Sequence, residues 1–396
     1  MRHHLIVLGA GYAGVAAAGH LARHLHPDDV EVTVVNPEPD FVERMRLHQL
    51  ATGDEPRRHD LTKVFAGTGV RLRVARVDAV DAEHRTVTVS DDQGTDRLEY
   101  DTLLYAIGST SGGAAVPGVA EHAHHVAERP AALRLHQRMT DLGENGTVLV
   151  VGGNLTAIEL ATEIAESWPH LRVTVATTGE LGGWLSRKAR RHLLRAFDRF
   201  GIEVHEHTTI GRVTPTGAVA ADGTVFAADA TVWAAGFAAH PIAAASGLQV
   251  QDDGRITVDR MMRSVSHPGV YAAGDCAYVI GDNGRPLPMS CASAGFTRMQ
   301  VTATIIGDLT GRAVPEKTLG YLANCVSLGR RDAIFQAVDG DAASKSWSLR
   351  GRVAARIKAS VLVGAGWAAR NPTYGLPTRR HRLTTVADRA AEPVSA

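Results

Sequence analysis

The sequence is poor in cysteine and has no excess of charge of either sign. Its 396 residues include only three cysteines, Cys276, Cys291 and Cys325, too few for a disulfide framework and without zinc-site spacing. The 42 Lys and Arg residues equal the 42 Asp and Glu residues in number. We therefore expect no nucleic-acid partner, because binding to phosphates requires a surplus of positive charge.

Long apolar runs are also missing. The chain has no stretch of about 18 consecutive apolar residues, the length that predicts a membrane-spanning helix. The pattern of a secretory leader is absent too, because the first apolar run, 5–8, begins almost at once. Hydrophobic residues make up 44% of the chain, and the length predicts two or three domains of roughly 150 residues. We expect a soluble, multidomain, cytoplasmic protein.

The N-terminal part combines the elements of a dinucleotide-binding unit. An apolar run at 5–8 leads into the glycine-rich segment 9–14, an alanine-rich helical stretch follows over 15–25, and a second apolar run covers 30–35. This order of strand, glycine turn, helix and strand is the context that gives a GxGxxG motif its meaning. The segment therefore predicts a dinucleotide site rather than an ordinary strand–helix turn.

Each glycine of this motif has a separate task. Gly9 permits a tight turn, Gly11 lets the backbone approach a pyrophosphate, and Gly14 lets the helix pack closely on the strand. Tyr12 and Ala13 lie between them, where the helix N-terminus would meet the phosphates. We expect all five residues to contribute to cofactor binding.

The second strand ends in an unusual residue for such a unit. Asp or Glu commonly binds the ribose hydroxyls at this point, whereas this chain has Asn36. An amide can both donate and accept hydrogen bonds, so Asn36 is a candidate ribose contact, with Glu38 as an alternative.

A second, less regular glycine loop lies near the middle of the chain. The apolar run 147–151 leads into Gly152, Gly153 and Asn154, and a helical stretch and another strand follow. Asn154 stands where the second glycine would let backbone approach a pyrophosphate. Two interpretations stay open: a nicotinamide site of unusual composition, or a domain retained as scaffold. The strand end, 176–178, has neither an acid nor an arginine, so it does not choose between NADH and NADPH.

Three further segments carry a resemblance to a known family. The segment 269–275 ends in Gly274 and Asp275, and two apolar stretches, 101–109 and 229–237, each contain a glycine where the chain would cross between domains. With the first glycine loop, they resemble the FAD fingerprints of flavoproteins with two dinucleotide-binding domains, the pyridine nucleotide-disulfide oxidoreductase superfamily. The resemblance implies that Gly108, Gly274 and Asp275 contact FAD, with Asp275 bonded to the ribityl chain.

The position of the cysteines narrows the branch of this superfamily. Because no cysteine precedes Cys276, disulfide-reductase and cysteine-peroxidase chemistry are excluded, and the sulfide:quinone oxidoreductases fit poorly. The chain is most similar to the type II NADH dehydrogenase-like and ferroptosis-suppressor-like quinone reductases. Glu159 stands where that group has a glutamate near the nicotinamide. One departure concerns the acceptor, because Ala292 replaces the glutamine of the quinone site.

Arg46 and His48 are further candidates for catalysis, together with Glu159. They belong to a short predicted helix that borders the flavin in the family, where a cation could stabilise reduced flavin or a quinone oxygen. The alternative is a solvated helix face. We find no cluster with metal-ligand spacing and expect no metal site.

Residues 350–367 predict a basic amphipathic helix with a tryptophan. Val353, Ile357 and Val361 fall on one line, while the basic residues, among them Lys358, lie largely off it. Such a helix is a candidate for peripheral contact with a membrane, here at its inner face. Packing on its own domain or on a second copy in a homodimer is the alternative.

Together, these patterns predict an α/β protein with two Rossmann-like domains. The FAD-binding domain would comprise residues 1–112 and 257–318, and an inserted NAD(P)-binding domain residues 113–256. A C-terminal α+β region, 319–377, would cap the flavin, and residues 378–396 would form a disordered tail.

The expected activity is transfer of hydride from NADH or NADPH through FAD to a quinone or similar small electron acceptor. Two alternatives remain open at this point. The protein could oxidise a small biosynthetic substrate directly without NAD(P)H, or it could be a non-catalytic FAD-binding partner protein.

Overall fold

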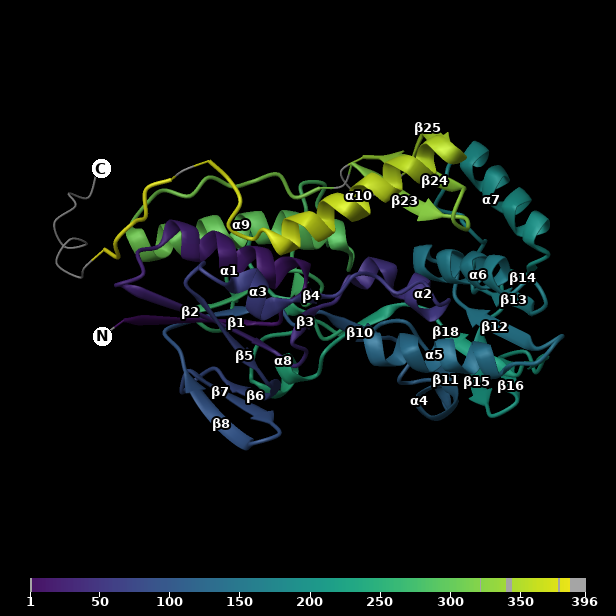
Figure 1. Ribbon diagram of the computed structural model, residues 1–396, viewed down its shortest axis with the longest axis horizontal. Helices are drawn as coiled ribbons and strands as arrows, with labels where there is room; N and C mark the ends of the chain where they lie inside the picture. The colour runs from purple at the N-terminus through teal and green to yellow at the C-terminus, as the bar shows by residue number, and fades with distance from the viewer. Residues whose placement is uncertain (1, 321, 340–343, 377, 385–396) are drawn as a thin grey trace.

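Two parallel sheets form the centres of two domains in the computed structural model, which describes residues 2–320, 322–339, 344–376 and 378–384 (Figure 1). The first sheet has the order β21 (Val270–Ala272), β9 (Thr102–Tyr105), β1 (His3–Leu8), β2 (Val30–Asn36) and β5 (Val70–Val74). Its strands are parallel throughout. The continuous apolar run of β1 reflects this arrangement, because a parallel sheet is buried on both faces.

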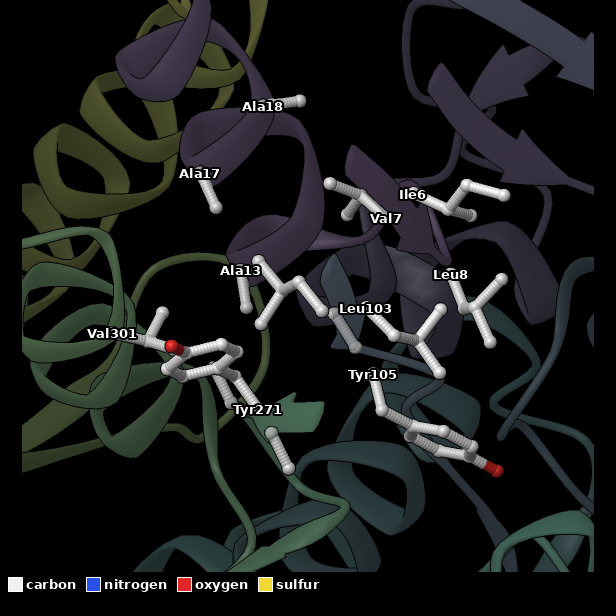
Figure 2. Packing of buried hydrophobic residues seen from close by; sticks show 14 of the residues in the cluster. Ile6, Val7, Leu8, Ala13, Ala17, Ala18, Leu103, Tyr105, Tyr271 and Val301 are labelled. Atoms are coloured by element: carbon white, nitrogen blue, oxygen red, sulfur yellow. The ribbon is translucent and has the colours of Figure 1, made fainter. Parts of the chain in front are cut away.

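Two helices and a small sheet cover the first parallel sheet. Helix α1 (Tyr12–His24) packs against α9 (Cys291–Thr310), and the antiparallel sheet of β6 (Arg76–Asp81), β7 (Thr86–Asp91) and β8 (Gly94–Glu99) shares the same core. Figure 2 shows the small side chains Ala13 and Ala17 of α1 beside the larger ones of β1 and β9, with Val301 of α9 nearby. Alanines allow this close packing of helix on sheet.

The second sheet lies between segments of the first in the sequence. Its order is β11 (Ala123–His124), β18 (Ala230–Trp233), β12 (Thr147–Val151), β13 (Arg172–Ala176) and β14 (Glu203–His205). It packs with α5 (Arg129–Asp141), α6 (Leu155–Ser167), α7 (Arg187–Phe200) and a small sheet of β15 (Ile210–Thr214), β16 (Gly217–Ala220) and β17 (Val225–Ala227). The expected α/β class with two Rossmann-like cores is confirmed, while the exact domain boundaries stay predictions.

Two connections join the domains. Strand β10 (Ser109–Ser111) pairs with β19 (Phe237–Ala239), so the two chain crossings run antiparallel to each other. The short helices η1 (Arg44–Arg46) and α2 (Leu47–Ala51) extend from the first domain, and α2 packs on α5 and α6. Leu47 and Leu50 accordingly belong to the core of the second domain.

The C-terminal region spans both domains. The antiparallel strands β23 (Ala323–Ser327), β24 (Ala333–Val338) and β25 (Ser344–Arg350) pack on the second domain, and α10 (Arg352–Arg370) returns from them to α1 (Figure 1). A Cβ atom at Gly19 would come within 2.4 Å of the Pro372 Cβ, which explains the glycine in mid-helix. Within the tail that was expected to be disordered, His381 bridges to Leu25; residues 385–396 lie outside the described residues.

Shorter elements complete the fold. They are β3 (Asp40–Phe41), β4 (His59–Asp60), α3 (Leu61–Phe65), α4 (Val119–His122), α8 (Ile242–Ala245), β20 (Ile256–Thr257) and β22 (Ala277–Tyr278). In the described part of the chain, no helix combines the length and the apolar character needed to cross a membrane.

Candidate functional site

The first glycine loop leaves space in front of the N-terminus of α1. Gly9 has a φ of +96°, and a Cβ at Gly14 would lie 1.8 Å from the Gly9 carbonyl oxygen, so both positions require glycine for packing. A Cβ at Gly11, in contrast, would meet no atom within 4 Å. Gly11 therefore borders open space at a helix N-terminus, where backbone N–H groups attract phosphate.

Tyr12 and Ala13 begin α1 beside this space. The Tyr12 ring packs edge-on against Phe41, at 5.1 Å between ring centroids. Its hydroxyl is buried and has no hydrogen-bond partner among the described residues, and burial raises the pKa of the phenol. A Cβ at Gly274 would be 3.4 Å from the Ala13 Cβ. The fold thus brings the second part of the FAD fingerprint against the first.

Asn36 ties the glycine loop to the end of β2. Its Oδ1 accepts a hydrogen bond from the Ala10 N–H at 2.8 Å, and its Nδ2 donates to the Glu38 carbonyl at 2.8 Å. The amide therefore holds the loop in place by using a donor and an acceptor at once. A contact with a ribose, by Asn36 or by Glu38, stays a prediction.

Asp275 is held by two residues that the sequence interpretation did not identify. Ser109 donates a hydrogen bond from Oγ to Asp275 Oδ2 at 2.6 Å, and Arg44 Nη1 lies 3.6 Å from the same oxygen. Arg44 also donates from Nη2 to Ser109 Oγ at 3.0 Å, and its guanidinium lies 5.1 Å from the centre of the Phe237 ring. A Cβ at Gly108 would be 3.1 Å from Arg44 Nη1, so this glycine leaves room for the arginine.

These features fit FAD. The open space at Gly11, at a helix N-terminus, would accept a pyrophosphate, and the anchored carboxylate of Asp275 would accept hydrogen bonds from ribityl hydroxyls. The Gly274 N–H donates to Thr297 Oγ1 of α9 at 3.0 Å, which fixes the loop that carries Asp275.

Burial raises the pKa of the Cys276 and Cys291 thiols to about 12, so neither is a thiolate at neutral pH.

The second glycine loop is shaped by the same physical constraints as the first. A Cβ at Gly152 would lie 2.7 Å from the Ala234 carbonyl oxygen, and one at Gly153 would lie 2.3 Å from Thr177 Oγ1. Asn154 caps α6: its Oδ1 accepts from the Ala157 N–H at 3.0 Å, while its Nδ2 donates to Ala234 O at 2.8 Å. The Asn154 side chain is thus engaged with its own domain.

Glu159 and His48 come together in a buried cluster where α2, α6, β23 and α10 meet. The carboxylate of Glu159 accepts a hydrogen bond from the Ser327 N–H at 3.0 Å, and His48 Nδ1 lies 3.8 Å from its second oxygen. Lys358 of α10 forms an ion pair with Glu159. Burial lowers the pKa of His48 to about 3, so the imidazole is neutral at neutral pH and is no part of a solvated helix face.

Lys358 differs from its expected place. The amphipathic pattern assigned it to the polar side of the helix, whereas the side chain is buried, with 8% of the residue exposed. Burial lowers the pKa of its ammonium to about 7. Val353 and Val361, on the apolar line of the same helix, are about half exposed at 56% and 50%. A sequence pattern could not reveal this, because the neighbours of Lys358 come from distant segments.

Arg46 lies apart from this cluster. Its Nε forms an ion pair with Glu43 at 2.8 Å, and Glu43 also binds His59 Nε2 at 2.8 Å. Of the three residues that the sequence suggests for catalysis, Glu159 and His48 therefore share the buried cluster, whereas Arg46 belongs to a separate ion-paired group with Glu43 and His59. Among the described residues, no three His, Cys, Asp or Glu side chains are grouped so that they could share a metal ion.

The geometry defines a protein with two dinucleotide-binding domains, and the comparisons assign its family. Residues 3–297 match the family model described as pyridine nucleotide-disulphide oxidoreductase, which covers most of the chain. The chain belongs to the pyridine nucleotide-disulphide oxidoreductase family.

Individual relatives are similar to this chain over a longer stretch than the family model. An NADH dehydrogenase-like protein of Mycobacterium tuberculosis is 28% identical over 84% of this chain and 87% of its own length. A type II NADH:quinone oxidoreductase of Staphylococcus aureus is 24% identical over 87% of this chain and 92% of its own. The structure of a Plasmodium falciparum NDH2 in complex with NADH has the same fold, with a TM-score of 0.79 at 14% identity, covering 94% and 97% of the two chains.

Proposed function

We propose that this chain is an FAD-dependent NAD(P)H dehydrogenase that delivers electrons to a quinone or a similar small acceptor. One observation carries the proposal: the fold brings Gly274 of the Asp275 loop against Ala13 at the start of α1 and leaves open space at Gly11, at the N-terminus of the same helix. Relatives named as NADH dehydrogenase-like and as NADH:quinone oxidoreductase support the donor and the acceptor.

The residues of the chain bind and orient FAD and the nicotinamide nucleotide. FAD, when bound, supplies the capacity to accept hydride from nicotinamide and to pass electrons onward. In the proposal, Gly11 and the N-terminus of α1 bind its pyrophosphate, while Asp275, held by Ser109 and Arg44, orients the ribityl chain. Gly152 and Gly153 form the corresponding loop for NADH or NADPH.

In the proposal, the buried cluster of Glu159, Lys358 and His48 supplies protons for reduction of the acceptor. Lys358 has a pKa lowered to about 7 by burial, and it lies against Glu159, which His48 also approaches. A group with a pKa near neutrality exchanges protons readily at the working pH. Reduction of a quinone consumes protons, so we assign Lys358 the task of supplying them, with Glu159 as the carboxylate that holds its ammonium and His48 as a neutral positioning residue.

Peripheral contact with a membrane is part of the proposal. The outer side of α10 presents Val353, Val361 and Trp367, all at least 40% exposed, with Arg352 and Arg356 beside them. An apolar helix face bordered by cations suits the surface of an anionic membrane. A position at the inner face of the membrane and a homodimer stay predictions.

The test is consumption of nucleotide by the purified yellow protein. We expect NADH or NADPH to be oxidised on addition of a soluble naphthoquinone, and the rate to be lost in Asp275→Ala, which no longer retains flavin. Rapid oxidation of a small organic substrate without either nucleotide would instead favour a direct oxidase or dehydrogenase. Flavin that is bound but reacts with no donor would favour a non-catalytic partner protein.

A further inference from the structure

A cavity of about 160 Å³ lies between α10 and the segment around η1. We call it the arginine pocket. The residues of its wall that matter here are Glu43, Arg46, Arg57, Leu362, Val363 and Arg370. A Cβ at Gly366 would be 3.2 Å from Glu43 Oε1, so this glycine lets α10 approach the opposite wall.

The arginine pocket has more positive than negative side chains in its wall. Glu43, the acidic residue of its wall, is already engaged by Arg46 and by His59, each at 2.8 Å. Among the described residues, neither Arg57 nor Arg370 has a carboxylate within ion-pair distance; Arg370 Nε donates instead to the Gly366 carbonyl, at 3.3 Å. Two guanidinium groups are therefore left to face the cavity or the solvent.

The other side of the arginine pocket is apolar and lies close to the proposed site. Leu362 and Val363 line it, and Leu362 follows one helical turn after Lys358, the partner of Glu159. On the opposite wall, Glu43 follows two residues after Phe41, whose ring packs on that of Tyr12. One wall of the cavity is thus connected to the start of α1 and the other to the buried cluster of Glu159, Lys358 and His48.

We infer that the arginine pocket selects an electron acceptor that carries an anionic group on an apolar ring, such as an acidic quinone. The ring packs on Leu362 and Val363, and the anionic group pairs with Arg57 and Arg370. This inference rests on the proposed function and names the acceptor class for it. The reaction balances as quinone plus NAD(P)H plus one proton giving hydroquinone plus NAD(P)⁺, with two electrons passing from the nicotinamide to the quinone.

The experiment compares naphthoquinone sulfonate, a permanent anion, with unsubstituted naphthoquinone. Binding of each to the oxidised FAD-containing protein is measured by calorimetry without nucleotide, and kcat/KM for each is measured with NAD(P)H. The double variant R57Q/R370Q is expected to weaken sulfonate binding roughly five- to tenfold, as for the loss of two partly exposed ion pairs. Added salt should weaken sulfonate binding to the parent protein in the same sense.

The ratio of kcat/KM for the sulfonate to kcat/KM for the unsubstituted quinone separates selection by charge from differences in redox potential. The ratio of kcat/KM for the two quinones should fall in R57Q/R370Q by the same factor as the binding, because the difference in redox potential cancels between variants. Arg195→Gln, an exposed arginine of α7, is the matched control and should leave the ratio unchanged. Thermal unfolding of both variants verifies that they fold.

The outcomes distinguish this inference from the proposed function. Equal reduction of both quinones, with a ratio that the double variant does not change, would overturn the inference and leave the proposed function standing. Charge-selective binding with no oxidation of either nucleotide would contradict the proposed function while the pocket still selects an anion. Loss of binding to anionic lipid vesicles in R57Q/R370Q, with the quinone ratio unchanged, would assign the pocket to a lipid head group and overturn the inference.

Discussion

Lys358 of α10 is paired with Glu159 of α6 in a site where both side chains are about nine-tenths buried. The pair joins the C-terminal helix to the inserted domain, and His48 of the first domain completes the contact from α2. Three segments that are remote in the sequence therefore meet at one carboxylate. The position of this carboxylate depends on the packing of the whole molecule.

Breaking the pair should be costly. Lys358→Met leaves the Glu159 carboxylate buried with its cation removed, and such a loss typically costs about 3–5 kcal/mol. We expect a lower midpoint of urea unfolding in Lys358→Met and a partial recovery in the double variant Glu159→Gln/Lys358→Met. Additive effects of the two substitutions in this double-mutant cycle would show that the residues do not interact.

Stability should fall on the acid side of neutrality because of His48. Its pKa is lowered by burial from 6.5 to about 3, so the unfolded chain binds this proton more tightly than the folded chain. The free energy of unfolding therefore decreases as the pH drops from 6.5 towards 3, by up to about 1.4 kcal/mol per pH unit. His48→Leu should flatten this slope in urea titrations at several pH values; an unchanged slope would mean that His48 is not buried as described.

The two glycines of the first loop should respond differently to alanine. Gly11→Ala introduces a Cβ into open space, so the protein should fold but retain much less FAD, measured as flavin absorbance per chain. Gly14→Ala places a Cβ 1.8 Å from a carbonyl oxygen and should prevent proper folding of the first domain. A well-folded Gly11→Ala protein with full flavin content would contradict the assignment of this space to the pyrophosphate.

Asn154 offers a test of the second glycine loop. Asn154→Ala removes the cap of α6 and should lower stability by about 1 kcal/mol, whereas Asn154→Gly should cost only a few tenths. Because the amide is turned towards its own domain, Asn154→Gly should leave the affinity for NAD(P)H unchanged. A large gain in affinity in Asn154→Gly, measured by flavin reduction at varied nucleotide concentration, would mean that the side chain obstructs the site.

Features that depend on neighbours close in the chain could be predicted from the sequence. The glycine loops at Gly9 and Gly152 follow apolar strands, and that order predicts two Rossmann-like units. The insertion of one in the other is predicted because the FAD motifs at Gly9 and Asp275, the latter recognised by the family resemblance, bracket Gly152. The spacing of Gly9, Gly11 and Gly14 even distinguishes packing from binding positions, since each glycine has its own geometric requirement. Such features depend on neighbours within one strand–turn–helix unit.

The roles of residues whose partners are far away in the chain could not be predicted from the sequence. Lys358 was assigned to the polar side of its helix, because a helical pattern does not reveal that Glu159 covers it. Arg44 could not be linked to Asp275, since the two residues are far apart in the sequence and meet only in the folded first domain. Ser109 directly follows Gly108 at the end of an expected strand, and that position was the one local signal that could have identified it.

Transfer of hydride from nicotinamide to the bound flavin is measured by anaerobic stopped-flow reduction of the purified yellow protein. The visible absorption band of the bound flavin is followed after mixing with NADH and, separately, with NADPH. We expect rapid bleaching by at least one nucleotide, and loss of that bleaching in Gly153→Val, whose side chain would collide with Thr177. Flavin that remains oxidised with both nucleotides, in a protein with full flavin content, would contradict the assignment of this chain as an NAD(P)H dehydrogenase.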